Sequence, residues 1–236
     1  FPKSYTFDNY IKIFTDTSIL NFPKMFMNTL IIAIFTCIIS TIFVLSVSYC
    51  MSRMRFKMRK PFMNIAMIIG LFPSFMSMIA VYYILRALNL ADGAMIRVAL
   101  IIVFSAGSGA GFYVAKGFFD TISKSLDEAA IIDGATRWNV FTKITVPLSK
   151  PIIVYTILTS FMGPWVDFIF GKVICRADAQ YYTVSIGLWK MLEKEYIDSW
   201  YTCFAAGAVV VSIPIAILFL MTQKFYVEGM TGAVKG

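Results

Sequence analysis

Five stretches of the sequence, between 16 and 28 residues long, contain no Asp, Glu, Lys or Arg. They are residues 25–52, 61–85, 98–115, 151–166 and 199–223. A helix crosses the ~30 Å hydrocarbon core of a bilayer with about 20 apolar residues. Backbone polar groups in lipid must also bond within their own segment. We therefore predict five transmembrane helices, the fourth reaching residue 171 past Asp167. The expected fold class is an all-α, polytopic transmembrane helical bundle.

The composition agrees with a membrane protein and excludes several classes of enzyme. Apolar residues make up 59% of the 236 residues and charged residues only 14%, against roughly half and a quarter in soluble domains. The chain has no histidine, which excludes Ser-His-Asp triads and histidine-bearing zinc sites. The cysteines stand singly, and we interpret them as small apolar residues; they are Cys37, Cys50, Cys175 and Cys203. We expect neither a catalytic site, a metal site nor a cofactor.

Lysine and arginine are distributed unequally between the two sets of segments that the spans would separate. Segments 53–60, 116–150 and 224–236 together hold 12 Lys or Arg and 5 Asp or Glu. The remaining segments, 1–24, 86–97 and 167–198, hold 9 and 8. Because Lys and Arg in short loops stay cytoplasmic, we predict that the first set is cytoplasmic. Residues 1–24 would then form an external N-terminal segment, and 224–236 a cytoplasmic tail.

The strongest contribution to this asymmetry is the basic run between residues 53 and 60. Five of its eight residues are Lys or Arg. Anchoring at the cytoplasmic face is the main interpretation, and a patch that binds lipid headgroups or nucleic acid is the alternative. Residues 1–24 lack the apolar core of a signal peptide. An external Phe1 therefore predicts a further span upstream of this sequence.

The loop 116–150 predicts two short helices. Ser125 and Glu128 have the spacing of a capping box, with Ser125 as N-cap. Gly134 stands where a helix ends in a left-handed residue, which gives a helix over 126–133. A second helix over 136–144 should stop before Pro147, because proline cannot continue the hydrogen-bond ladder.

The first of these helices has the character of a docking element. Ala129 and Ala130 add no bulk to its surface, while Leu126, Ile131 and Ile132 are apolar. Small amphipathic helices dock in grooves of partner proteins. A helix lying on the membrane or on its own bundle is the alternative.

Glu128-Ala129-Ala130-x-x-x-Gly134, followed by Ile144-x-Val146-Pro147, resembles the EAA loop of ABC importer permeases. The ending 225–236 and the segment 158–189 resemble the carbohydrate uptake subfamily, and within it the smaller of two partner permeases of the maltose-transporter type. The resemblance covers essentially the whole chain. Ser123 stands where the family usually has proline, and Val146 where it usually has leucine.

This resemblance implies a type I ABC importer permease fold of six helices, of which five are present and the first lies upstream. It implies a bacterial inner-membrane subunit, with ATP bound by a separate ATPase. The implied partners are a second homologous permease, a cytoplasmic ATPase dimer and an extracytoplasmic solute-binding protein, which would meet segment 171–199. No nucleic acid is implied. The residues implied to contact the ATPase are Glu128, Ala129, Ala130, Gly134, Ile144, Pro147 and, in the tail, Gly232, Lys235 and Gly236.

The substrate pathway is less marked in the sequence. Tyr155 and Trp165 could stack on a sugar ring, and Asp167 is an acid interrupting a span, which is a functional candidate. Packing or a place at the membrane interface is the alternative for all three. The glycines at 107, 109 and 111 predict close helix packing rather than a phosphate loop, since the motif's lysine is absent.

The predicted function is therefore a permease subunit that forms half of a pathway for a sugar or oligosaccharide. Import of a non-sugar solute, for example glycerol phosphate, is one alternative. A stand-alone secondary transporter is another, but it would favour buried charges or paired broken helices within the spans.

Overall fold

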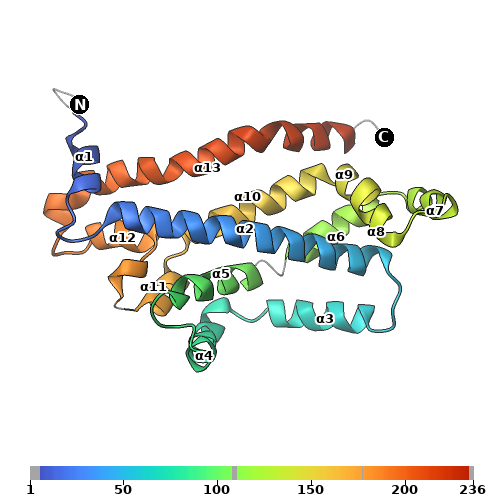
Figure 1. Ribbon diagram of the computed structural model, residues 1–236, viewed down its shortest axis with the longest axis horizontal. Helices are drawn as coiled ribbons and strands as arrows, with labels where there is room; N and C mark the ends of the chain where they lie inside the picture. The colour runs from blue at the N-terminus through green and yellow to red at the C-terminus, as the bar shows by residue number, and fades with distance from the viewer. Residues whose placement is uncertain (1–5, 108–110, 177, 234–236) are drawn as a thin grey trace. The chain divides into compact units, whose positions relative to one another are not determined.

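The computed structural model describes residues 6–107, 111–176 and 178–233, and all regular structure in these ranges is helical. Figure 1 labels the helices along the chain. They are α1 (Asp8–Thr15), α2 (Phe22–Arg53), α3 (Arg59–Gly70), α4 (Ser74–Ala87), α5 (Met95–Gly107), α6 (Gly111–Thr121), α7 (Lys124–Ile132), α8 (Arg137–Val140), α9 (Val146–Leu148), α10 (Lys150–Val166), α11 (Ile169–Cys175), α12 (Val184–Met191) and α13 (Ile197–Ala233). A π-helical turn, η2, covers Phe141–Thr145, and a 3₁₀ turn, η3, covers Ala179–Tyr181.

The chain divides into two compact units. Unit 1 consists of Phe1–Thr36, Ser74–Phe104 and Phe161–Leu218. Unit 2 consists of Cys37–Pro73, Ser105–Ser160 and Phe219–Gly236. Helices α2, α5, α10 and α13 contribute residues to both units.

Two helices within the described ranges are long and apolar enough to cross a membrane: α2 and the Ile197–Phe225 part of α13. The number rises to four if each of two bent helix pairs forms one span. The prediction of one helix over 61–85 is wrong, because α3 ends at Gly70 and α4 begins at Ser74. Pro73 lies in this break, where its missing N–H would interrupt a helical ladder.

Three other predicted spans differ from the structure, two because they are divided between two helices and one at its end. The segment 98–115 falls on α5 and α6, and the glycine cluster at 108–110 lies outside the described residues. The segment 151–171 is divided, because α10 ends at Val166 and α11 begins at Ile169. Helix α13 continues past residue 223 to Ala233, so the predicted tail begins as helix.

A buried asparagine connects three segments of unit 1. The Asn28 side chain on α2 is 1% exposed. Its Nδ2 donates to the carbonyl oxygens of Gln180 (2.9 Å) and Tyr182 (3.2 Å), and its Oδ1 accepts from Arg97 Nε of α5 (2.9 Å). Both the nitrogen and the oxygen of the Asn28 amide therefore have hydrogen-bond partners, as buried polar groups normally do.

Gly187 leaves room for the side chain of Met25 in unit 1. A Cβ added to Gly187 of α12 would lie 2.5 Å from Met25 Sδ of α2. By contrast, a Cβ at Gly111, in the glycine cluster predicted to pack closely, would meet Val44 only at 3.8 Å. The tighter side-chain contact is therefore at Gly187, which lies outside the glycine cluster of the sequence.

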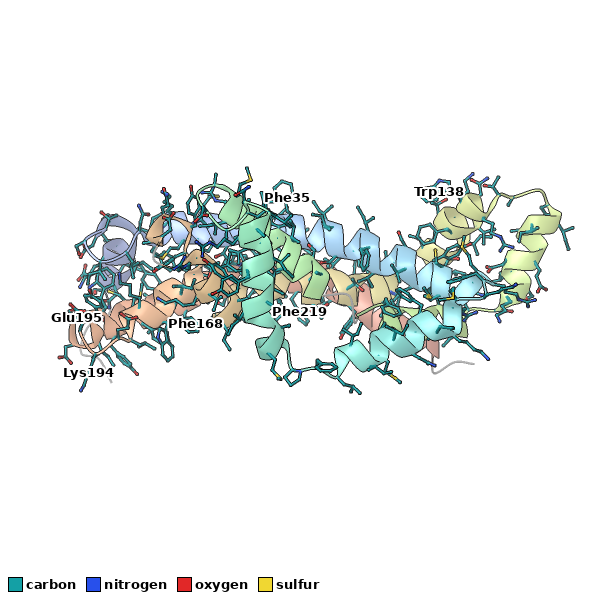
Figure 2. The ribbon with its side chains drawn as sticks, turned by 90° about the horizontal axis from the view of Figure 1, so that it is seen from below. Phe35, Trp138, Phe168, Lys194, Glu195 and Phe219 are labelled. Carbon is teal, nitrogen blue, oxygen red and sulfur yellow. The ribbon has the colours of Figure 1, made fainter. Side chains whose placement is uncertain are left out.

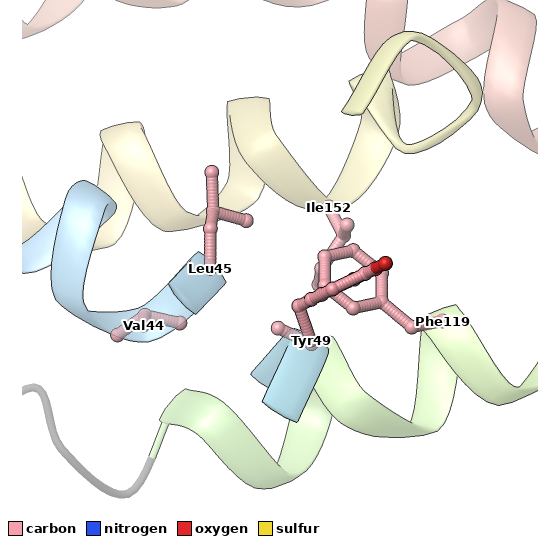
Figure 3. Close-up of a cluster of buried hydrophobic side chains, with 6 residues drawn as sticks. Val44, Leu45, Tyr49, Phe119 and Ile152 are labelled. Carbon is pink, nitrogen blue, oxygen red and sulfur yellow. The ribbon is translucent and has the colours of Figure 1, made fainter. Parts of the chain in front are cut away.

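The core of unit 2 lies where α2, α6 and α10 meet (Figure 3). Its buried members are Val44, Leu45, Tyr49, Ala115, Phe119 and Ile152. Ser48 Oγ, in the same stretch of α2, donates to the carbonyl oxygen of Val44 (2.6 Å) and also lies 3.0 Å from that of Phe112. This cluster fixes the last turns of α2 against the end of α6, which leads into the loop 116–150.

Candidate functional site

Arg53, the last residue of α2, holds the beginning of the 116–150 loop. Its side chain is 2% exposed, and its Nη2 donates to the carbonyl oxygens of Phe119 and Ile122, both at 2.8 Å. Its Nη1 lies 3.4 Å from the Asp127 carboxylate in the first turn of α7. One guanidinium therefore joins the end of a long apolar helix to both the end of α6 and the start of α7.

Two neighbours of Arg53 strengthen this attachment. Ser52 Oγ donates to Asp120 Oδ1 (2.6 Å), and Asp120 also pairs with Lys116 one turn earlier on α6. Tyr49 Oη donates to the carbonyl oxygen of Arg137 at the start of α8 (3.2 Å). The last two turns of α2 thus contact α6, α7 and α8 through polar groups.

The N-terminus of α7 differs from the prediction. The helix begins at Lys124, and the N-cap is Ser123, whose side chain accepts a hydrogen bond from the Ser125 N–H (3.3 Å). Ser125 as N-cap is wrong, and Glu128 therefore does not close a capping box. The two serines share the cap region, with their Oγ atoms 2.7 Å apart. The φ of Ser123 is −58°, close to the value that proline's ring fixes, so the departure from the family's proline leaves the backbone path compatible.

The C-terminus of α7 confirms the prediction that Gly134 is the left-handed residue that ends this helix. Its φ is +84°, and its N–H donates to the Ile131 carbonyl (3.0 Å). The Ala135 N–H donates to the Ala130 carbonyl (2.9 Å). These two bonds form a Schellman motif, which satisfies carbonyls at the helix end and needs a left-handed residue at this position.

The second helical segment continues further than predicted. Thr136 caps α8, accepting from the Asn139 N–H (3.2 Å). The expected stop before Pro147 is wrong, because the π-helical turn η2 and then α9 carry the helical run to Leu148. The Val146 N–H bonds to the Phe141 carbonyl, five residues back. The wider turn accommodates Pro147 near the start of α9, where its missing donor costs little.

Apolar side chains lie exposed on α7 and α8. Ile132 is 85% exposed and Trp138 is 69% exposed, and Leu126 and Ile131 are also exposed. Figure 2 shows Trp138 on the outside of its helix. Contiguous exposed apolar side chains are typical of protein or membrane contact sites.

The residues between 128 and 147 that are predicted to couple to an ATPase belong to this segment of unit 2. Glu128 and Ala129 are exposed and Ala130 is half-buried on α7, with Gly134 directly after the helix. Ile144 is half-buried in η2, and Pro147 is exposed in α9. In the tail, Gly232 lies in the last turn of α13, while Lys235 and Gly236 lie outside the described residues.

The three pathway candidates are divided between the two units. Tyr155 belongs to unit 2 and is exposed on α10. Trp165, in unit 1, is 2% exposed and packs edge-on against Phe26 (5.3 Å between centroids). Asp167, also in unit 1, accepts the Gly171 N–H (2.9 Å) in the break between α10 and α11.

The segment 171–199 carries charged residues at its turns, including Lys194 and Glu195 before α13 (Figure 2). Cys175 is buried there, and burial, followed by the charge of Asp178, raises the pKa of its thiol to about 12. All four cysteines are free. Within the part of the chain that the structure describes, no group of three His, Cys, Asp or Glu could hold a metal ion.

What sequence reasoning missed is the role of Arg53. In the sequence it is one of the five basic residues between 53 and 60. Its partners are two backbone carbonyls and an acid 74 positions away, and nothing in the local sequence identifies such partners. The only available signal was that Arg53 is the first charge after the 25–52 stretch.

The sequence pattern of binding-protein-dependent transport system inner membrane components matches residues 45–230. The galactooligosaccharides transport system permease protein GanQ of Bacillus subtilis (strain 168) is 35% identical over 237 residues, covering 100% of this chain and 82% of GanQ. The maltodextrin transport system permease protein MdxG of the same strain is 32% identical, covering 100% of this chain and 83% of MdxG.

A solved structure agrees with these sequence relatives. The crystal structure of a bacterial ABC transporter involved in the import of the acidic polysaccharide alginate contains a chain that matches with a TM-score of 0.77. It is 25% identical, and the match covers 95% of this chain and 81% of that chain. The fold is therefore that of an ABC importer permease. The chain belongs to the family of binding-protein-dependent transport system inner membrane components, which are multi-pass membrane permeases.

Proposed function

We propose that this chain is the transmembrane permease subunit of an ATP-driven importer for a sugar or oligosaccharide. Its relatives are named for galactooligosaccharide and maltodextrin transport, and the matching structure for alginate import. These substrates share a polymer of sugar units, which supports a carbohydrate over glycerol phosphate or another small solute. The observation that carries the coupling part of the proposal is the attachment of α7 to α2 through Arg53.

Helix α7 is suited to transmit movement because it is capped at both ends and fixed at its base. Its apolar residues Ile132 and Leu126 remain exposed in the single chain, so a protein partner would bury them. We assign this partner as a cytoplasmic ATPase. A displacement of α7 would reach α2 directly, because the Arg53–Asp127 pair crosses between them and the Arg53–Ile122 bond holds the turn before α7.

ATP would act by shifting a population between two conformations. The ATPase dimer closes when it binds ATP, and a ligand favours whichever state binds it better. In this proposal closure moves α7, and the end of α2 moves with it. ATP is held by the ATPase alone, and this chain contributes no cofactor site of its own.

The remaining partners follow from the same assignment. The basic distribution supports a cytoplasmic place for 53–60, 116–150 and the tail 224–236. Segment 171–199 would face outward and meet a solute-binding protein, where complementary charge accelerates docking. A second permease would supply the other half of the pathway. Tyr155, Trp165 and Asp167 remain proposed pathway residues.

The ATPase assignment can be tested by photo-crosslinking. The photoreactive residue p-benzoylphenylalanine replaces Ile132 on α7 and, as control, Ile11 on α1, which is also exposed. With the whole transporter in membranes, the 132 variant should give a covalent product with the ATPase and the 11 variant should not. An ATPase product from position 11 alone, or from neither, would contradict the assignment.

A further inference from the structure

A polar cavity lies in unit 2 beside the end of α2. Its volume is about 520 Å³, within the range of roughly 300–1,000 Å³ that small-molecule sites occupy. It is lined by the end of α2, the following loop, one side of α7 and the start of α8. The lining residues are Ser52, Arg53, Met54, Arg55, Arg59, Lys124, Asp127, Glu128, Ile131 and Arg137.

The cavity carries an excess of positive charge. Five of its lining residues are Lys or Arg and two are acids. One of the acids, Asp127, is paired with Arg53. Across residues 6–107, 111–176 and 178–233, no acidic group lies within 4.0 Å of the charged nitrogens of Arg55, Arg59, Lys124 or Arg137. These four cations line a shared space in which Glu128 is the remaining lining acid, and Arg59 also interacts with the charge of Asp120 outside the lining. An anion in this space would lower the repulsion among the cations.

The buried guanidinium of Arg53 has hydrogen-bonding capacity left. Its Nη2 is satisfied by two carbonyls, whereas Nε and Nη1 are buried without a hydrogen-bond acceptor among the described residues. Nη1 has only the 3.4 Å ion pair with Asp127. Buried donors are normally satisfied, and the planar arginine fork matches phosphate oxygens. An oxyanion in the cavity would supply the missing acceptors.

The surroundings of the cavity indicate where this oxyanion comes from. Residues 53–59 alternate strictly between basic and apolar side chains, and the apolar Phe56 and Met58 are exposed. Helix α3, which follows directly, has no buried residue and exposes Phe62 and Ile65. Exposed apolar side chains interleaved with cations are typical of a segment at a membrane surface. The loop that lines the cavity thus continues directly into a segment suited to lipid chains.

We propose that this cavity binds the phosphate of an anionic phospholipid headgroup, with Arg55 and Arg59 as principal ligands and Arg53 beneath them. The fatty-acyl chains would lie along the apolar face of α3. Because Lys124, Asp127 and Ile131 of α7 also line the cavity, the bound lipid would contact the same helix that Arg53 holds. The site does not depend on which solute is transported.

The test measures lipid binding to the purified transporter with all its subunits in neutral detergent. Native mass spectrometry gives the affinity for dioctanoyl phosphatidylglycerol, dioctanoyl phosphatidylcholine and inorganic phosphate. Two double variants are compared. Arg55→Gln with Arg59→Gln removes two cavity cations, while Lys57→Gln with Lys60→Gln removes the same charge from the same basic run outside the cavity.

We expect the wild type to bind phosphatidylglycerol in preference to phosphatidylcholine, a comparison that needs no variant to fold. The Arg55/Arg59 variant should bind phosphatidylglycerol about tenfold more weakly or worse, and the Lys57/Lys60 variant should bind it within about twofold of wild type.

Equal weakening of lipid binding in both variants would mean that diffuse surface charge attracts the lipid, and it would overturn the site. Inorganic phosphate binding as tightly as the lipid would make the ligand a free anion. Lipid binding that begins only after the ATPase is removed would assign the cavity to the ATPase interface. Each of these two results also overturns the proposal, whereas loss of transport alone would bear only on the proposed function.

Discussion

The Arg53 guanidinium at the end of α2 lies 3.4 Å from the Asp127 carboxylate in the first turn of α7, with exposed fractions of 2% and 13%. The two residues are distant in sequence, and they belong to different kinds of segment. One ends a long apolar helix that is expected to cross the membrane, and the other begins a short capped helix. Their contact joins these two helices directly.

Replacing Arg53 should destabilise unit 2 strongly. Arg53→Met leaves two carbonyls and the Asp127 carboxylate without their partner, and breaking a buried pair in this way costs about 3 kcal/mol or more. Lys57→Met, in the exposed loop that follows, should change stability by less than about 0.5 kcal/mol. Thermal unfolding of the purified complex in detergent measures both. Equal midpoints for the two variants would show that the pair does not hold α7 in place.

The N-cap of α7 is Ser123 in the structure, whereas the sequence pattern predicted Ser125. Ser123→Ala removes the side chain that accepts the Ser125 N–H, and loss of an N-cap costs about 1 kcal/mol. Ser125→Ala should cost less, because that residue already lies inside the helix. Hydrogen exchange of the α7 amides reports local opening, and it should be faster in Ser123→Ala. Faster exchange in Ser125→Ala alone would restore the capping box that the sequence suggested.

The close approach at Gly187 can be tested with its neighbour. Gly187→Val should lower the stability of unit 1 by about 1–3 kcal/mol, because its side chain would collide with Met25. The double variant with Met25→Ala should recover part of this loss. Gly163→Ala is a matched control, since an added Cβ there meets no atom within 4 Å. The measurement is the thermal midpoint of the wild type, the two single variants and the double variant. A Gly187→Val midpoint equal to that of the wild type would mean that Met25 does not lie against Gly187.

The sequence predicted the elements whose causes are local. Charge-free runs identified the segments of α2 and α13, because lipid requires long helices without charge. Gly134 was predicted correctly because a helix end needs a left-handed residue in a defined place. The grouping of Glu128, Ala129 and Ala130 on one exposed helix also followed from a contiguous motif.

What the sequence could not predict depends on contacts between distant segments or on close energetic alternatives. Serine is a favourable N-cap residue at both 123 and 125. A helix that starts two residues earlier therefore differs little in local free energy. Pro147 was expected to end a helix, but the helical run continues through the π-helical turn η2 into α9, which contains Pro147. The break at Pro73 lay inside a run that composition alone describes as continuous. Arg53 and Asn28 act through partners 66 to 154 positions away, which no local pattern encodes.

Gly134 offers the most direct test of the claim that α7 couples this permease to an ATPase. Its φ of +84° disfavours a side chain, although an added Cβ would meet no atom within 4 Å. Gly134→Leu therefore strains the C-cap by about 1–2 kcal/mol and adds bulk where the partner docks. Gly134→Asn is the control, because asparagine tolerates the left-handed region better than other side chains.

The measurement is substrate-stimulated ATP hydrolysis and sugar uptake by the reconstituted transporter in vesicles, with each variant confirmed in the membrane. We predict that Gly134→Leu retains ATP hydrolysis but loses uptake by about tenfold or more, and that Gly134→Asn keeps most of it. Uptake by Gly134→Leu at the wild-type rate would contradict the account.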